Sequence, residues 1–228
     1  MALPRLSVPV LAFAAVAAFA PQTGAQAATA YDSGVGAADA TYLEPSYTGP
    51  VGDPIDDYEL ADDIILGSDY DIGSATFLGS STDAAPFSFD IAFYAVDGAA
   101  PATSPTASRT GVAYSTFDTG ETLNGRALQS YTIAFDVISL TAGNWWVSIV
   151  ANAQGDDKWH WAGVYQNTSS MRFREAGGGG AWGTYTPLDM ALTLDAGASG
   201  TPVPAPAALP LLAAGLAGFA LVGRRRRA

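Results

Sequence analysis

Residues 87–96, FSFDIAFYAV, decide the fold class, because apolar and aromatic side chains recur there at every second position. Successive side chains of a strand point to opposite faces, so Phe87, Phe89, Ile91 and Phe93 are expected to share one face. Asp97-Gly98 and two prolines follow within residues 97–105, which indicates a turn after the strand. The stretch therefore predicts a β-strand with one buried face.

The same pattern recurs on both sides of this strand. Tyr131, Ile133, Phe135 and Val137 alternate in one segment, and Leu188, Met190, Leu192 and Leu194 alternate in another. The central part of the chain holds no good helical period, and turn residues separate its short segments. We therefore predict an all-β ectodomain, a single antiparallel β-sandwich of jelly-roll type. The predicted strands are residues 58–66, 71–79, 87–96, 109–117, 129–140, 144–152, 157–165, 170–176 and 187–196.

Both ends of the chain are apolar. Residues 1–27 place Arg5 before an apolar stretch and end in Ala25-Gln26-Ala27, the layout of a secretory signal peptide. Residues 207–223 carry no charge and are about long enough for a membrane-spanning helix. Four arginines follow directly, and the positive-inside rule keeps them in the cytoplasm. The expected layout is signal peptide 1–27, ectodomain 28–196, linker and sorting box 197–206, transmembrane helix 207–223 and basic tail 224–228.

The tail resembles a known class of bacterial sorting signal. The box Val203, Pro204, Ala205, Pro206, Ala207 precedes the apolar helix, and Arg224, Arg225, Arg226 and Arg227 close the chain. This order is similar to the PEP-CTERM class, and the box is closest to its VPLPA-CTERM variant, with Ala205 where leucine is usual. The resemblance implies export by the translocon and signal peptidase, recognition by an exosortase-type membrane protease, and delivery to the cell envelope or extracellular matrix. Residues 31–194 also resemble a β-sandwich ectodomain found with such tails, for which no reaction is implied.

The charge of the exported part is strongly negative. Between residues 28 and 202 the chain holds 22 acidic residues and five basic ones, which gives a formal net charge of −17. Such a domain repels nucleic acid, so no nucleic-acid partner is expected. The chain contains no cysteine, and about 175 residues can bury a sufficient core without disulfides.

Aromatic residues are the first candidates for ligand binding. Trp146, Trp182 and Tyr185 are expected at the surface, where they could stack on the sugar rings of an exopolysaccharide. Trp145 and the pair Trp159 and Trp161 are expected in the core, because large aromatics are usually buried.

Carboxylates offer the next candidates. Asp62 and Asp63, and Asp156 and Asp157, have the hard oxygen ligands that suit calcium, but no calcium-binding loop motif surrounds them. Side chains of adjacent strand residues face opposite ways, so Asp62 and Asp63 could share one ion only at a bulge. No cofactor is therefore assigned, with calcium as the remaining candidate.

Catalytic motifs are absent from the sequence. His160 is the only histidine, and no G-x-S-x-G nucleophile motif occurs. The sequence therefore indicates a non-catalytic exported protein of the cell envelope or matrix. Two alternatives remain: a secreted hydrolase acting on polysaccharide through two carboxylates, and a structural or adhesive surface protein that self-associates.

Overall fold

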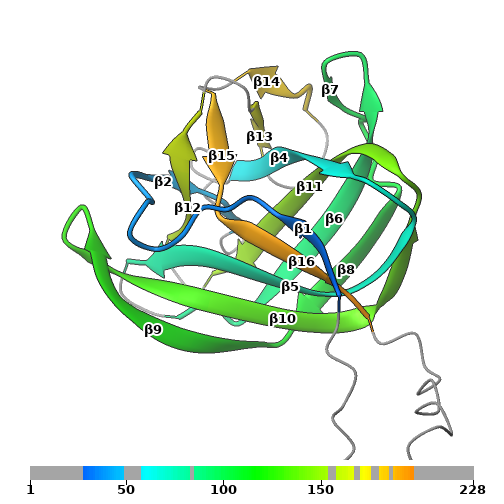
Figure 1. Cartoon of the computed structure of the whole chain (residues 1–228). Coiled ribbons are helices and arrows are strands. Elements are labelled where there is room, and N and C mark those ends of the chain that lie inside the picture. Colours follow the sequence, from blue (N-terminus) through cyan, green and yellow to red (C-terminus); the bar gives the residue numbers. More distant parts are fainter. Residues whose placement is uncertain are drawn as a thin grey trace, which may run out of the picture.

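A computed structural model describes residues 28–48, 58–82, 85–153, 158–166, 170–175, 180–184 and 187–197. These residues form sixteen strands, and no described residue lies in a helix (Figure 1). The prediction of an all-β fold is thus confirmed. Within the same residues no helix is long and apolar enough to span a membrane. The predicted signal peptide, sorting box, transmembrane helix and basic tail lie outside the described residues.

Eight strands form the first sheet, which we call sheet A. Its main path runs β1-β16-β5-β10-β9, and β12 joins β2 and β15 to β5. The long central pair is β5 and β10, flanked by shorter strands at both edges. The strands are β1 (Thr29–Asp32), β2 (Tyr42–Pro45), β5 (Tyr70–Ser81), β9 (Tyr114–Leu123), β10 (Arg126–Leu140), β12 (Trp159–Tyr165), β15 (Leu188–Met190) and β16 (Leu192–Ala196).

The other eight strands form sheet B, in the order β14-β13-β4-β3-β11-β6-β7, with β8 beside β6. All pairs within it are antiparallel except β3 with β11, which is parallel and departs from the purely antiparallel prediction. This short parallel contact extends the edge of β11 beyond its pairing with β4. The strands are β3 (Tyr47–Thr48), β4 (Tyr58–Leu66), β6 (Ser88–Asp97), β7 (Ala100–Pro101), β8 (Ala107–Val112), β11 (Gly143–Asn152), β13 (Met171–Glu175) and β14 (Gly183–Thr184).

One hydrophobic core joins the inner faces of the two sheets. Phe77 and Tyr131 of sheet A and Phe89 of sheet B meet there, and the Phe77 and Phe89 ring centroids lie 4.9 Å apart at 74°. Trp159 and Trp161 are buried in this core, as the sequence predicted. Edge-to-face aromatic packing of this kind contributes beyond the area that it buries.

Two of the predicted apolar faces are interrupted. Phe87 lies before β6 and is 69% exposed, so only Phe89, Ile91 and Phe93 of that set are buried. In β10 the pairing with β5 shifts between Ala134 and Ile138. Before this bulge the odd-numbered residues of β10 face the core, and after it the even-numbered ones do. Val137 is therefore exposed, while Ile138 and Leu140 reach the core.

Two predicted strands are each divided in two. The segment 109–117 breaks at Ala113, because β8 pairs with β6 in sheet B whereas β9 pairs with β10 in sheet A. The segment 187–196 breaks at Ala191, whose carbonyl accepts bonds from the Leu78 backbone and the Trp161 ring. The alternating set Leu188, Met190, Leu192 and Leu194 is nevertheless fully buried, as predicted.

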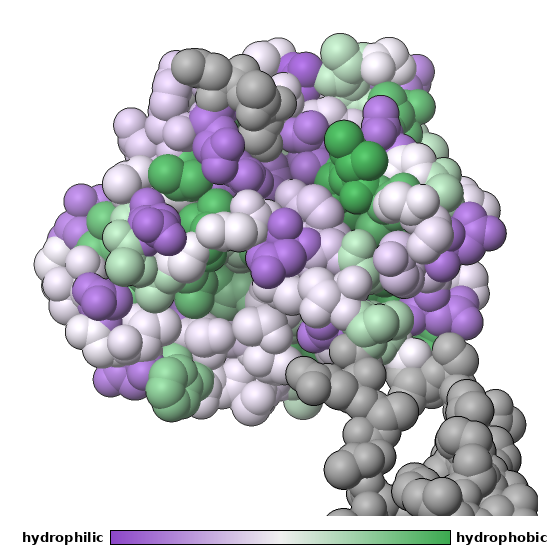
Figure 2. All heavy atoms as spheres, viewed as in Figure 1, coloured by the Kyte–Doolittle hydropathy of each residue, from purple (hydrophilic) through white to green (hydrophobic). Residues whose placement is uncertain are grey.

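The first and last described residues lie side by side. The Ala196 N–H donates to the Ala28 carbonyl at 2.8 Å, next to the pairing of β1 with β16. Asn124 and Gly125 both have positive φ and close the hairpin between β9 and β10. On the face of the molecule that Figure 2 shows, hydrophilic and hydrophobic residues are interspersed.

Candidate functional site

The outward face of sheet B holds the most organised group of polar side chains. Along β4, Leu60 and Ile64 point into the core, so Glu59 and Ala61 point outward. On β11, Val147 and Ile149 are in the core, which leaves Ser148 on the outward face. The strict period of the strands therefore sets which residues build this site.

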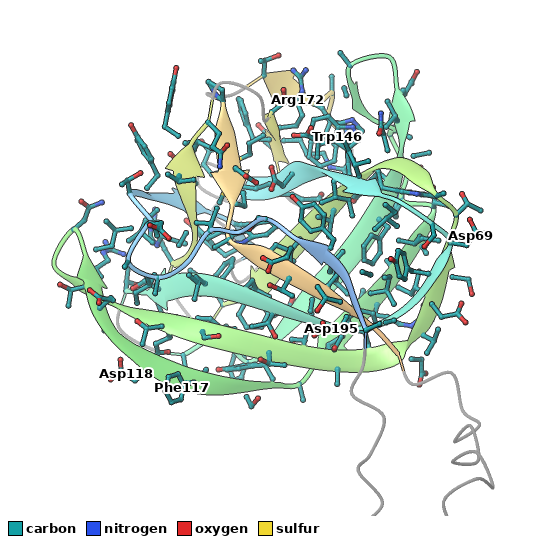
Figure 3. The ribbon with its side chains drawn as sticks, viewed as in Figure 1. Asp69, Phe117, Asp118, Trp146, Arg172 and Asp195 are labelled. Atoms are coloured by element: carbon teal, nitrogen blue, oxygen red, sulfur yellow. The ribbon has the colours of Figure 1, made fainter. Side chains whose placement is uncertain are left out.

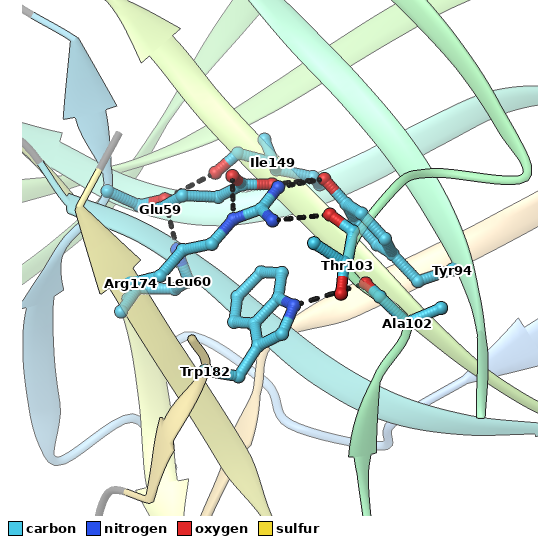
Figure 4. A network of polar contacts seen from close by, with 9 residues as sticks. Glu59, Leu60, Tyr94, Ala102, Thr103, Ile149, Arg174 and Trp182 are labelled. Atoms are coloured by element: carbon cyan, nitrogen blue, oxygen red, sulfur yellow. Dashed lines mark hydrogen bonds and ion pairs between the residues drawn. The ribbon is translucent and has the colours of Figure 1, made fainter. Parts of the chain in front are cut away.

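A buried ion pair stands at the centre of this face. Glu59 and Arg174 are paired in register across β4 and β13, and Arg174 Nε lies 2.7 Å from Glu59 Oε2. The two residues are 7% and 4% exposed, respectively. Tyr94 of β6 donates its hydroxyl to Glu59 Oε1 at 2.5 Å and accepts from Arg174 Nη2 at 2.8 Å (Figure 4). Arg174 Nη1 donates to the Thr103 carbonyl, so each nitrogen of the guanidinium makes one hydrogen bond within the protein.

Burial and the neighbouring Glu59 carboxylate raise the pKa of the Tyr94 hydroxyl above its usual value of 10. Tyr94 therefore stays protonated and remains a hydrogen-bond donor to Glu59 throughout the physiological range. The network is rigid, because each of its charged groups has a fixed partner in a region of low dielectric.

Two tryptophans support the arginines of β13. The Trp182 ring centroid lies 4.2 Å from Arg174 Cζ, and its Nε1 donates to the Ala102 carbonyl at 3.2 Å. The Trp146 ring lies 5.8 Å from Arg172 Cζ, and Figure 3 shows these two residues together beside β13. These cation–π contacts hold the guanidiniums against the sheet.

A hollow of about 260 Å³ lies next to this network. Strands β4, β6, β8 and β11 and the segment from Thr103 to Pro105 border it. Two carboxylates, Glu59 and Asp90, and two guanidiniums, Arg109 and Arg174, are its charged lining residues. Its other lining includes the hydroxyls of Thr48, Thr103, Ser104, Ser108, Thr110 and Ser148.

Two of the three predicted platform residues, Trp146 and Trp182, are described, and neither is fully exposed. Trp146 is only 4% exposed and packs on Ala61 and Tyr94, so the prediction that it faces solvent is wrong. Trp182 is half-buried beneath Arg174, and its indole N–H donates to the Ala102 carbonyl. Tyr185 lies outside the described residues. Trp145 packs against the main core on the opposite face from Trp146, as adjacent strand residues must.

The two calcium candidates that the structure describes, Asp62 and Asp63, point to opposite faces of β4. Asp62 points into the core, where its Oδ2 accepts from the Met190 N–H at 3.0 Å. Asp63 points outward and accepts from the Ser170 N–H at 2.7 Å. Asp156 and Asp157 lie outside the described residues. Within the described part of the chain, no group of three or more metal-ligating side chains is arranged to hold an ion.

Asp62 has an unusual electrostatic environment. Burial, followed by the charge of Asp189, raises its pKa well above the usual value near 4. Burial and the charge of Asp63 raise the pKa of Asp189 to about 6. Because Asp62 Oδ1 also has no hydrogen-bond partner, this carboxyl is best satisfied in its neutral, protonated form.

The sole histidine lies away from the hollow, on the outward side of sheet A. His160 Nδ1 is 3.3 Å from Arg126 Nη1, and burial together with this cation lowers the His160 pKa. The imidazole is therefore neutral near pH 7.

The sequence pattern did not point to the network residues Glu59, Tyr94 and Arg174, or to Ser148 in the lining of the hollow. One signal was present in residues 171–175, MRFRE, where two of the five basic residues found between residues 28 and 202 alternate on one strand face. Arginines at such spacing on a strand need partners on the adjacent strand, and Glu59 is the acidic residue that the register supplies. The register itself could not be inferred from the sequence.

No protein-family model matches the chain, and no curated protein sequence is significantly similar to it.

Proposed function

We propose that this chain is an exported, non-catalytic protein of the cell envelope or extracellular matrix, sorted by an exosortase-type system and able to bind exopolysaccharide. The tail carries the sorting part of the proposal. It combines the box 203–207, an apolar span and four arginines in the order that such a signal requires. A jelly-roll-like sandwich flanked by a signal peptide and a transmembrane helix is the architecture that we propose for the whole chain.

The described fold supports this proposal in one respect. Because Ala28 and Ala196 are hydrogen-bonded neighbours, the segments before and after the described fold attach at one point. A fold anchored there leaves its remaining surface, including the outward face of sheet B, accessible to a matrix polymer. The chain's partners on this proposal are the translocon, signal peptidase, an exosortase-type protease and an exopolysaccharide.

Expression in a Gram-negative host that has an exosortase tests the sorting proposal. Cells are fractionated, and the chain is followed by immunoblotting in membrane, matrix and medium. We expect the full chain to reach the envelope or matrix in a shortened form. We expect a chain lacking residues 203–228 to be exported across the inner membrane without retention in the membrane or matrix.

A variant with Pro204 and Pro206 replaced by alanine is expected to stay membrane-bound and unprocessed. Replacement of Arg224–Arg227 by lysines is the matched control, since it retains the positive charge that orients the span. The same distribution for the full and truncated chains would overturn the sorting proposal. Glycan turnover that disappears in single carboxylate-to-amide variants would overturn the non-catalytic assignment.

A further inference from the structure

We propose that the hollow on the outward face of sheet B binds one sugar residue of a neutral polysaccharide. This inference rests on the proposed function and assigns it a site and a ligand class. It replaces the aromatic platform that the sequence suggested with a polar site built on β4, β6, β8 and β11.

The hollow exists because a row of small side chains crosses the sheet. Ser148 pairs with Ala61 on one side and with Ala92 on the other, and Ala92 pairs in turn with Ser108. Larger side chains stand in the rows on either side, among them Glu59 and Tyr94. The row of small side chains therefore forms a trough, one residue wide, between two rows of larger side chains.

Ser148 is an unpartnered hydroxyl within this trough. The residue is 1% exposed, and its Oγ has no hydrogen-bond partner. Its two cross-strand neighbours are alanines, which offer it no side-chain polar group. A buried hydroxyl without a partner is unfavourable. A ligand hydroxyl that pairs with Ser148 would therefore supply the hydrogen bond that Ser148 lacks in the free protein.

The walls present polar groups in fixed positions. Arg174 uses one N–H of each Nη on protein partners, so each of these nitrogens has a second N–H available. Asp90 Oδ1 is fixed by the Asn152 side chain at 2.8 Å and by the Gly111 N–H at 2.7 Å. Fixed donors and acceptors side by side suit vicinal hydroxyls, each of which can both donate and accept.

The charges of the site favour a neutral ligand. The two carboxylates and two guanidiniums that line it cancel formally. Arg174 is paired with Glu59, and the Arg109 guanidinium donates to the carbonyls of Ser108, Asp136 and Val137. The surrounding exported part carries a formal charge of −17, which repels polyanions. A volume of about 260 Å³ is at the small end for ligand pockets and suits one sugar ring.

Isothermal titration calorimetry tests the inference on the full chain, purified in a polyoxyethylene detergent that carries no sugar. The probes are malto- and cello-oligosaccharides and soluble mannan as neutral glycans, with alginate as the anionic one. We expect at least one neutral glycan to bind and alginate to bind at least tenfold more weakly. Tighter binding of alginate would overturn the neutral ligand class.

Variants then locate the site. Ser148→Leu and, on a neighbouring strand, Ala92→Leu fill the trough and should each weaken binding by more than tenfold. Ser148→Ala removes one hydroxyl without filling space and should weaken binding about fivefold, the effect of one neutral hydrogen bond. Ser130→Leu, the same change on β10 of sheet A, is the matched control and should bind as the wild type does.

Near-ultraviolet circular dichroism of each variant identifies any that fails to fold, and Ser148→Ala then decides. Glycan binding that persists within twofold in the folded Ser148 and Ala92 variants would overturn this site and leave the proposed function standing. Absence of binding to every neutral glycan would also overturn the inference. The fractionation experiment on the tail tests the sorting proposal independently of both outcomes.

Discussion

At the scale of single residues, buried charge is the distinctive feature of this protein. Asp62 and the pair Glu59 and Arg174 are all at least nine-tenths buried, yet their neighbours compensate their charges to different extents. Arg174 compensates Glu59 directly, whereas Asp62 has no cation beside it, accepts from backbone N–H groups such as that of Met190, and faces the charge of Asp189. The first arrangement places opposite charges side by side, and the second favours a protonated carboxyl.

The substitution Asp62→Asn should flatten the pH dependence of stability. The folded protein keeps the Asp62 proton at pH values at which the unfolded chain, with a pKa near 4, has lost it. The free energy of unfolding therefore falls as pH rises from about 4 to the raised folded pKa, by about 1.4 kcal/mol per pH unit of that interval. Asn keeps the carbonyl that accepts from Met190, so the variant should lack this loss.

Urea unfolding at pH 4, 6 and 8 measures the difference. The variant and the wild type should differ least near pH 4, and the variant should be the more stable at pH 8. Asp97→Asn, which removes an exposed carboxyl at the last residue of β6, is the control. An identical pH dependence for Asp62→Asn and the wild type would contradict the buried-proton interpretation.

The substitution Arg174→Met should destabilise the fold by about 3–5 kcal/mol, because it leaves Glu59 buried without its cation. The double variant Glu59→Met, Arg174→Met should lose less than Arg174→Met alone, since no isolated charge remains. Denaturant unfolding of the two single variants and the double variant measures the coupling. Equal losses in Arg174→Met and the double variant would show that Glu59 is well solvated in the absence of Arg174.

At the scale of elements, close backbone approach fixes how β12 joins sheet A. Gly79 of β5 pairs with Trp161 of β12, and the Trp159 ring lies over the position where a side chain at residue 79 would begin. A Cβ at this position would meet Trp159 Cζ2 at 2.5 Å and the His160 carbonyl at 2.7 Å. The packing of the most deeply buried tryptophans thus requires a glycine in a strand, where glycine is otherwise unfavourable.

Gly79→Ala should therefore destabilise the protein by about 1–3 kcal/mol, the usual cost of overpacking a filled core. Thermal unfolding followed by tryptophan fluorescence is the measurement, because Trp159 must shift to admit the methyl group. Gly67→Ala is the matched control, since a Cβ there meets nothing within 4 Å, and it should have little effect. Equal melting temperatures for both variants would contradict the close approach.

At the scale of the whole molecule, excess negative charge opposes folding. The full chain carries a formal charge of −12, with the acidic residues confined to the part between the two apolar ends. The compact fold brings these charges closer together than the unfolded chain does, so their repulsion destabilises it. Salt reduces this repulsion over distances longer than the Debye length, about 10 Å at 0.1 M.

We therefore expect the melting temperature to rise when sodium chloride is increased from 0.05 to 0.5 M. Differential scanning calorimetry at pH 7.5 measures this change, and sucrose at matched osmolality controls for effects other than screening. A melting temperature that falls with salt would show that attractive pairs such as Glu59 with Arg174 outweigh the general repulsion.

Much of the core could be predicted from the alternation of residues within each strand. Leu188, Met190, Leu192 and Leu194 are buried as expected, and so are Trp159 and Trp161. The predicted strand faces and bounds are wrong where pairing with strands distant in the chain interrupts the two-residue period. The bulge in β10, opposite β5, turns Val137 outward. The segment 109–117 is divided because the chain passes there from pairing with β6 in sheet B to pairing with β10 in sheet A.

Local sequence determined the all-β fold class, because the two-residue period and turn chemistry act within about ten residues. The distribution of charge along the chain is likewise readable without a structure, and so is the resemblance of the tail to a sorting signal. The tertiary structure alone decided the candidate site. Register across β13, β4, β11 and β6 brings Arg174 to Glu59 and places Ser148 between two alanines. Pairing between strands far apart in sequence depends on the packing of the whole core, so no local pattern could reveal it.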